Sequence, residues 1–158
     1  MRLFFNFTEN RIIFDDHGNY YSDILELKNY LQNQQIKQLI VINGPGSYIG
    51  TRQAINICKS IQFIYPIPGF SFNLLRDMAT MLSPQIEYHC FKHLKLIYIY
   101  NSTEKKFSIQ NNWLTNVLFT SNQEDQGLYI DYSPKSIINS FQHIILQSLQ
   151  QEYFDKFI

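Results

Sequence analysis

Short apolar runs alternate with helically spaced apolar residues over the first half of this chain. Residues 1–7 and 11–16 are two strand-like runs, and the polar residues 8–10 between them predict a β-hairpin. Ser22 or Asp23 would cap a helix that extends to about residue 34, because apolar residues recur there at helical spacing: Ile24, Leu27 and Leu31.

The pattern continues with two further pairs of a strand and a helix. Strand-like runs at 38–42 and 67–70 are followed by helical spacing at 51–64 and 72–82. This β-β-α-β-α-β-α order predicts an α/β fold. Its mixed sheet would be antiparallel at its start and parallel after the crossovers.

The second half of the chain predicts a further group of strands and a closing helix. Apolar runs predict strands near 95–101, 105–110 and 127–132. Ser133 would cap the last helix and Pro134 would take its first position. The apolar face of this helix would consist of Ile138, Phe141, Ile145 and Leu149.

A glycine-rich turn over residues 44–50 joins the strand 38–42 to the helix that follows. Such a junction favours anions at the helix N-terminus, so a nucleotide-binding loop is the first hypothesis. A Walker A loop is excluded because Gly50 precedes Thr51 directly, without the lysine. The glycine spacing is also wrong for a Rossmann loop, and no ribose-binding acid follows near residues 69–71. A turn shaped for packing, with Ser47 as helix cap, is the other interpretation.

The run G-P-G-S-Y-I-G-T-R is similar to the G-P-G-S-F-T-G-L-R signature of the TsaB (YeaZ) family. Residues 65–71 resemble that family's I-P-V-x-G-V-S segment, and the opening strand is also similar, although Asn6 stands where an Asp is usual. Ile49 and Thr51 depart from the signature as well. The residues that match its loop are Gly44, Pro45, Gly46, Ser47, Gly50 and Arg52.

The resemblance implies an actin-like, ribonuclease-H-like (ASKHA) fold with a mixed sheet. It implies an N-terminal lobe over 1–83 and a truncated second lobe over 84–158. That fold has a third early strand, for which Tyr20 and Tyr21 leave little room.

TsaB proteins are bacterial partners of the enzyme that places threonylcarbamoyl on adenosine beside the tRNA anticodon. The resemblance therefore implies a non-catalytic scaffold that binds a TsaD-like catalytic subunit or a second copy of itself, with a TsaE-like ATPase joining the assembly. The contact would use the first two helices, through Leu27, Tyr30, Leu31, Ile55, Cys58 and Gln62, and apolar residues beyond a narrow core stripe such as Leu25 and Phe63. The alternative is that these residues complete a wide core face.

No residue pattern predicts a catalytic site, a metal site or a bound cofactor. Asn6 carries no charge for a metal, so an ATP site of the actin type is not expected. His89 and His93 would share a metal only on a helix, and no third ligand is evident. Ser47, Ser71 and Ser102 lack the G-x-S-x-G elbow that exposes a nucleophile.

Two other function classes stay open beside the scaffold. One is a small enzyme of the same superfamily, either a nucleotide-dependent kinase or a glycoprotease-like peptidase. The other is a degenerate paralogue that only forms homodimers.

Composition and charge bear on what the chain binds and where in the cell it is expected. The 158 residues have a formal net charge of zero, so tRNA binding by this chain alone is not expected. Cys58 and Cys90 do not form a disulfide framework typical of secreted proteins. Neither a signal peptide nor a membrane-spanning run is evident, so we expect a cytoplasmic location.

Overall fold

The computed structural model describes residues 1–111, 117–121 and 128–151. It divides into two units, of which the first comprises Met1–Phe72 with Leu146–Gln151 and the second the described part of Asn73–Ile145. The boundary predicted from the sequence lies after residue 83. The helical segment before that residue packs against strands of the second unit, and the unit boundary therefore lies about ten residues earlier.

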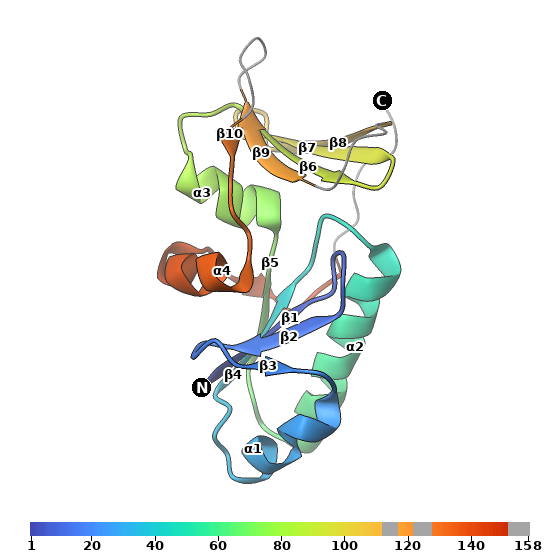
Figure 1. Ribbon diagram of the computed structural model, residues 1–158, viewed down its shortest axis with the longest axis vertical. Helices are drawn as coiled ribbons and strands as arrows, with labels where there is room; N and C mark the ends of the chain where they lie inside the picture. Colours follow the sequence, from blue (N-terminus) through green and yellow to red (C-terminus); the bar gives the residue numbers. More distant parts are fainter. Residues whose placement is uncertain (112–116, 122–127, 152–158) are drawn as a thin grey trace. The chain divides into compact units, whose positions relative to one another are not determined.

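The first unit contains a mixed sheet with the strand order β11-β5-β4-β1-β2-β3 (Figure 1). Strand β1 pairs antiparallel with β2 and parallel with β4, and β4 pairs parallel with β5. The predicted hairpin and the mixed α/β sheet are confirmed. The strands are β1 (Arg2–Asn6), β2 (Ile12–Asp15), β3 (Tyr20–Tyr21), β4 (Gln38–Ile42), β5 (Gly69–Phe72) and β11 (Gln147–Ser148).

The third early strand exists, so the expectation that Tyr20 and Tyr21 leave too little room for it is wrong. Two residues suffice because β3 pairs with β2 only through Ile13 opposite Tyr21 and Phe14 opposite Tyr20. A tight turn at residues 15–19 brings β3 back beside β2.

Two helical segments of the first unit follow the predicted pattern with shifted ends. Asp23 caps a 3₁₀ turn, η1 (Ile24–Leu27), which continues into helix α1 (Lys28–Gln32). Helix α2 (Tyr48–Ile64) begins three residues before the predicted start. None of the described helices is both long and apolar enough to cross a membrane.

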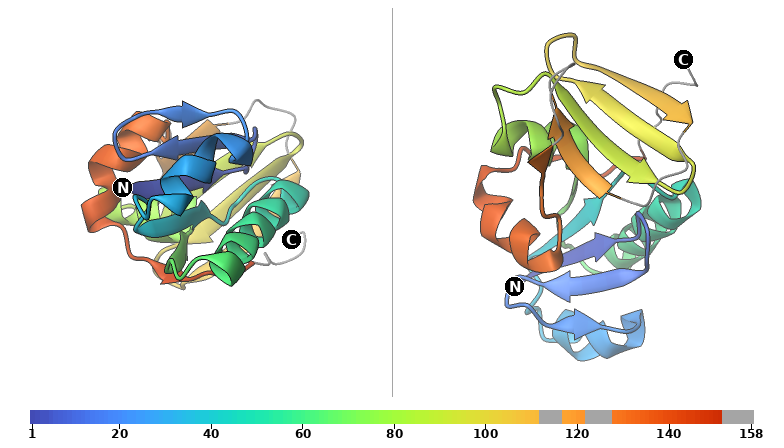
Figure 2. Two further views of the ribbon diagram at one scale, coloured as in Figure 1. Left: turned by 90° about the horizontal axis from the view of Figure 1, so that it is seen from below. Right: turned by 45° about the horizontal axis from the view of Figure 1, so that its top comes forward.

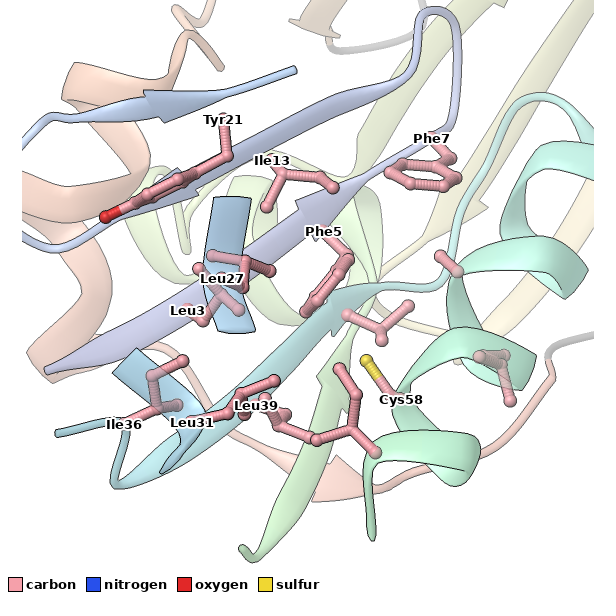
Figure 3. Close-up of a cluster of buried hydrophobic side chains, with 14 residues drawn as sticks. Leu3, Phe5, Phe7, Ile13, Tyr21, Leu27, Leu31, Ile36, Leu39 and Cys58 are labelled. Atoms are coloured by element: carbon pink, nitrogen blue, oxygen red, sulfur yellow. The ribbon is translucent and has the colours of Figure 1, made fainter. Parts of the chain in front are cut away.

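The core of the first unit lies between one face of the sheet and these helices (Figure 3). Alternate residues of β1, β2 and β4 point to this face, as the two-residue period of a strand requires. The remaining side chains come from helices α1 and α2, from η1 and β3, and from the loops that contain Phe7 and Ile36. The fully assembled cluster consists of Leu3, Phe5, Phe7, Ile13, Tyr21, Leu27, Leu31, Ile36, Leu39, Val41, Ala54, Ile55, Cys58 and Ile61.

The second unit has an antiparallel sheet with the strand order β10-β9-β6-β7-β8 (Figure 2). Its strands are β6 (Tyr88–His93), β7 (Leu96–Asn101), β8 (Lys106–Asn111), β9 (Val117–Ser121) and β10 (Leu128–Tyr129). Before them come a π-helix, η2 (Leu74–Ala79), and helix α3 (Thr80–Leu82). Strands β6 and β9 were not predicted. Residue 127, at the start of the third predicted strand, lies outside the described residues.

The closing helix is shorter than predicted. Ser133 caps it and Pro134 begins it as expected, but α4 (Pro134–Ser140) gives way to a 3₁₀ turn, η3 (Phe141–His143), and then to β11. The predicted apolar face is wrong, because Ile145 is 63% exposed and Ile137 is the fully buried residue. Strand pairing explains the end of the helix: Gln147 and Ser148 pair with β5, and Ser71 Oγ donates to the Ser148 carbonyl at 2.8 Å.

A buried carboxylate holds the turn between β2 and β3. Asp15 accepts hydrogen bonds from the backbone N–H groups of His17 and Asn19, at 2.8 and 3.1 Å, and from the Asn19 side chain at 3.0 Å. The Tyr21 hydroxyl donates to it at 2.5 Å. Burial opposes ionisation, but these four donors together hold the pKa of Asp15 below its usual value.

We predict that Asp15→Asn lowers the free energy of unfolding by about 2–3 kcal/mol, because the amide nitrogen cannot accept from donors that stay buried. Asp16→Asn is the matched control, since Asp16 pairs with Arg2 at 3.6 Å near the surface and should contribute under about 1 kcal/mol. Urea denaturation measures both. Equal losses in the two variants would contradict the assigned role of Asp15.

Candidate functional site

The glycine-rich loop is a corner closed by the backbone of the β1–β2 turn. The Ser47 N–H donates to the Thr8 carbonyl at 2.7 Å. A Cβ atom added to Gly46 would collide with that same carbonyl oxygen, and one added to Gly50 would collide with the carbonyl oxygen of Phe7. Gly44 and Gly46 also have φ angles of 130° and 138°, which side-chain-bearing residues rarely adopt. The loop therefore needs glycine for close packing.

Helix α2 starts from this corner with its cap in place. Ser47 Oγ accepts from the Gly50 N–H at 3.0 Å, and the Ser47 carbonyl accepts from Thr51 N–H at 3.0 Å. The predicted capping role of Ser47 is confirmed. The amides of Ser47 and Gly50, which a phosphate would need, are thus already engaged, while Arg52 lies exposed at the start of the second turn of the helix.

Polar side chains at the carboxyl ends of β1 and β4 are also engaged within the first unit. Ligands of α/β proteins bind at such strand ends. Asn6 Oδ1 accepts from the Thr8 hydroxyl at 2.7 Å, and Asn43 Nδ2 donates to Ser71 Oγ at 3.1 Å. Both residues are buried neutral amides, so this edge offers no carboxylate from these two positions to hold a metal-bound nucleotide.

The three serines considered as nucleophiles have structural roles. Ser47 caps α2, and Ser71 is fully buried beneath β11. In the second unit, Ser102 Oγ donates to the carbonyl of Ile86 at 2.8 Å. Each hydroxyl serves a backbone group, so none is set up for attack on a substrate.

His89 and His93 do not lie on the helix that sharing a metal would require. Both lie on β6, where four residues of extended chain separate them by about 13 Å instead of one helical turn. No group of three or more potential metal-ligating side chains occurs within the described residues. His89 is instead a core residue whose Nε2 lies 3.0 Å from the Ile86 carbonyl, and burial lowers its pKa.

Most of the residues predicted for a partner interface belong to the core. Leu27, Leu31, Ile55 and Cys58 are 0%, 6%, 3% and 0% exposed, and Cys58 points from α2 into the cluster (Figure 3). A docked protein cannot reach these side chains without unfolding the unit. The alternative of a wide core face therefore describes them correctly, because α1 and α2 cover the same face of one sheet.

The other two predicted interface residues are half-buried and have partners. Tyr30 packs edge-on against Tyr21, with ring centroids 5.9 Å apart. Gln62 Nε2 donates to the Ile67 carbonyl at 3.0 Å and so ties α2 to the loop before β5. Both positions support the geometry of the helices and leave only part of each side chain at the surface.

Large apolar side chains do remain exposed on these helices. Phe63 is 93% exposed, Leu25 75%, Ile64 71% and Ile49 70%. The sequence predicts Leu25 and Phe63 beyond the core stripe, but it does not predict the exposure of Ile49 and Ile64. Helical spacing alone would have placed Ile64 with the core, three residues after the buried Ile61.

No protein-family model matches the sequence, and no curated protein matches it. Among solved structures, the chain is similar to YeaZ from Pseudomonas aeruginosa, with 12% identity, a TM-score of 0.42, and coverage of 84% of this chain and 72% of that one. It is also similar to an uncharacterized protein with similarity to peptidase YEAZ from Pseudomonas aeruginosa, with 11% identity, a TM-score of 0.39, and coverage of 99% and 84%. Values this low say nothing about what the chain does.

We predict that Gly46→Ala lowers the free energy of unfolding by about 3 kcal/mol, because it adds both a collision with the Thr8 carbonyl and an unfavourable φ. Gly18→Ala is the matched control: Gly18 has a φ of 87° but no atom within 4 Å of the added Cβ. Its loss should be about 1 kcal/mol. Chemical denaturation compares the two, and equal losses would contradict the close packing of the corner.

We predict that stability falls as the pH drops below about 6.5, because unfolding frees His89 to bind a proton that its buried position disfavours. Above that pH the residue is neutral in both states and contributes no slope. In His89→Gln the fall should be shallower, whereas a variant of the exposed His143, His143→Gln, should follow the parent. Urea midpoints between pH 8 and 5 give the slopes, and identical slopes for His89→Gln and the parent would refute the assignment.

Proposed function

We propose that this chain is a TsaB-like, non-catalytic partner subunit in the synthesis of threonylcarbamoyladenosine in tRNA. It binds a TsaD-like catalytic subunit in the cytoplasm and stabilises that subunit's productive form, and a TsaE-like ATPase joins the assembly. The chain itself needs no cofactor, does not cleave peptides or transfer phosphate, and does not bind tRNA alone.

One observation carries the proposal: the signature loop is closed on its own hairpin, while the helix that it starts exposes large apolar side chains. The carbonyls of Phe7 and Thr8 fill the space beside Gly50 and Gly46, which a phosphate cradle would leave open. The loop therefore supports an activity that depends on where α2 points. The resemblance of residues 44–52 and 65–71 to the family motifs agrees with this use.

Both ends of α2 are fixed to the rest of the first unit. The glycine corner holds its start, and the hydrogen bond from Gln62 to Ile67 holds its last turn. Phe63 and Ile64 follow Gln62 directly and stay exposed. Burial of one such side chain against a partner stabilises a complex by about 1.5–3 kcal/mol. A helix held in one position loses little entropy on docking, so this gain is retained.

We predict that Phe63→Glu weakens binding to the TsaD-like subunit encoded by the same genome at least tenfold, because it places a charge where an apolar side chain is buried. Thermal stability of the isolated chain should stay unchanged, since Phe63 is 93% exposed. Gln142→Glu, at an exposed position of the second unit, introduces the same charge as a control. Calorimetry or size-exclusion chromatography with the purified subunit measures the effect.

Two outcomes would refute the proposal. One is the absence of any complex between the parent chain and the TsaD-like subunit. The other is a complex that neither Phe63→Glu nor Leu25→Glu weakens. In that case the rate of threonylcarbamoyl transfer to tRNA, measured in a reconstituted reaction, would also stay unchanged in both variants. A substitution at Ile55 would not serve here, because it would disrupt the core.

A further inference from the structure

A pocket opens in the first unit at the end of α2 that is far from the glycine corner. Its volume is about 400 Å³, within the range of small-molecule sites. One wall comes from the end of α1 and the loop that follows it, and the other from the loop between α2 and β5. The lining residues are Leu31, Gln32, Gln34, Ile36, Lys37, Tyr65, Pro66, Ile67 and Pro68.

The walls of the pocket are held by backbone hydrogen bonds within the first unit. On one side, the Gln35 N–H donates to the Tyr30 carbonyl at 2.9 Å and the Lys37 N–H to the Met1 carbonyl at 2.8 Å. On the other, the Pro68 carbonyl accepts from Leu39 N–H at 3.0 Å, and the Ile67 carbonyl accepts from the Gln62 side chain at 3.0 Å. A pocket formed before binding costs a ligand little ordering of the protein.

The chemistry of the lining favours one class of ligand. Leu31 and Ile36, 6% and 3% exposed, belong to the core cluster (Figure 3). Both also line the pocket and give it an apolar floor. Tyr65 and Ile67 extend this apolar surface along the second wall. Lys37 is the one charged residue of the lining and forms no ion pair with a described residue, and two glutamines, Gln32 and Gln34, also line the pocket. An apolar body with a single negative charge would match this arrangement.

We propose that this pocket binds a small amphiphile that carries one carboxylate, with its apolar body on Leu31, Ile36 and Ile67 and its charge at Lys37. The inference goes beyond the proposed function and does not rest on it. Seventeen residues of α2, about 25 Å of helix, separate the pocket from the glycine corner. Ligand binding here and partner binding through Phe63 are tested separately.

The test is a titration of the isolated full chain with octanoate, followed by the methyl NMR signals of Leu31, Ile36 and Ile67. We expect saturable shifts with a Kd below about 1 mM. Octan-1-ol, which has the same chain but no charge, should bind at least about fivefold more weakly, because it gains no attraction from Lys37.

Substitution of Lys37 distinguishes specific binding in the pocket from non-specific binding of an apolar chain. Lys37→Glu should weaken octanoate binding about tenfold and remove its advantage over octan-1-ol. Lys28→Glu is the matched control, because Lys28 is exposed on α1 but is not part of the lining. The proposal is overturned by the absence of saturation, by shifts confined to methyl groups outside the pocket, or by equal affinity in Lys37→Glu and the parent.

Discussion

The close approach of two glycines to two backbone carbonyls determines how the first unit is built. Gly46 and Gly50 lie against the carbonyls of Thr8 and Phe7, where no side chain fits. This contact joins the end of β1 to the start of α2, two segments that are separated by forty residues of sequence. It thereby sets the direction in which α2 leaves the sheet, and the buried face of α2 can then complete the core. The same contact places two carbonyl oxygens against the loop, and such oxygens do not attract a phosphate.

The core explains why functional surface is scarce on the two helices. Both α1 and α2 lie on one face of the sheet, and their central residues are fully used in covering it. What remains for recognition lies at the helix ends, at Leu25, Ile49, Phe63 and Ile64. The pocket lined by Leu31 and Ile36 also lies at the end of a helix, where the covering layer stops. Binding to another molecule is therefore expected at the margins of the helical layer.

Elements with local signals could be predicted from the sequence. The hairpin over residues 1–16 and the strand 38–42 follow from apolar runs, and the caps Ser47 and Ser133 follow from side chains that bond the next turn. Strand β6 was not predicted because its polar residues, including His89 and His93, interrupt the apolar pattern. Strand β11 was not predicted because its pairing partner, β5, lies about seventy-five residues away in the sequence. In addition, the helical spacing of residues 138–149 predicts a longer helix.

The candidate site was predictable only in part, for a related reason. The glycine loop stands out in the sequence because its composition is unusual, and its role as a corner follows from the missing lysine and the glycine spacing. Which apolar residues of α1 and α2 face the sheet depends on how both helices pack, which no single helix pattern contains. Ile55 and Cys58 therefore looked available to a partner, although they are core residues. The pocket at Lys37 is lined by two loops that are distant in the sequence, so no sequence pattern predicts it.

The central claim is that the glycine loop is a closed corner and not a nucleotide-binding loop. It is tested most directly by following the amide NMR signals of Ser47 and Gly50 in the isolated chain during a titration with ATP and Mg²⁺. The account predicts that both signals stay in place, because the Thr8 carbonyl and the Ser47 hydroxyl already hold these amides. Saturable shifts of both signals would show a nucleotide-binding loop and contradict the account.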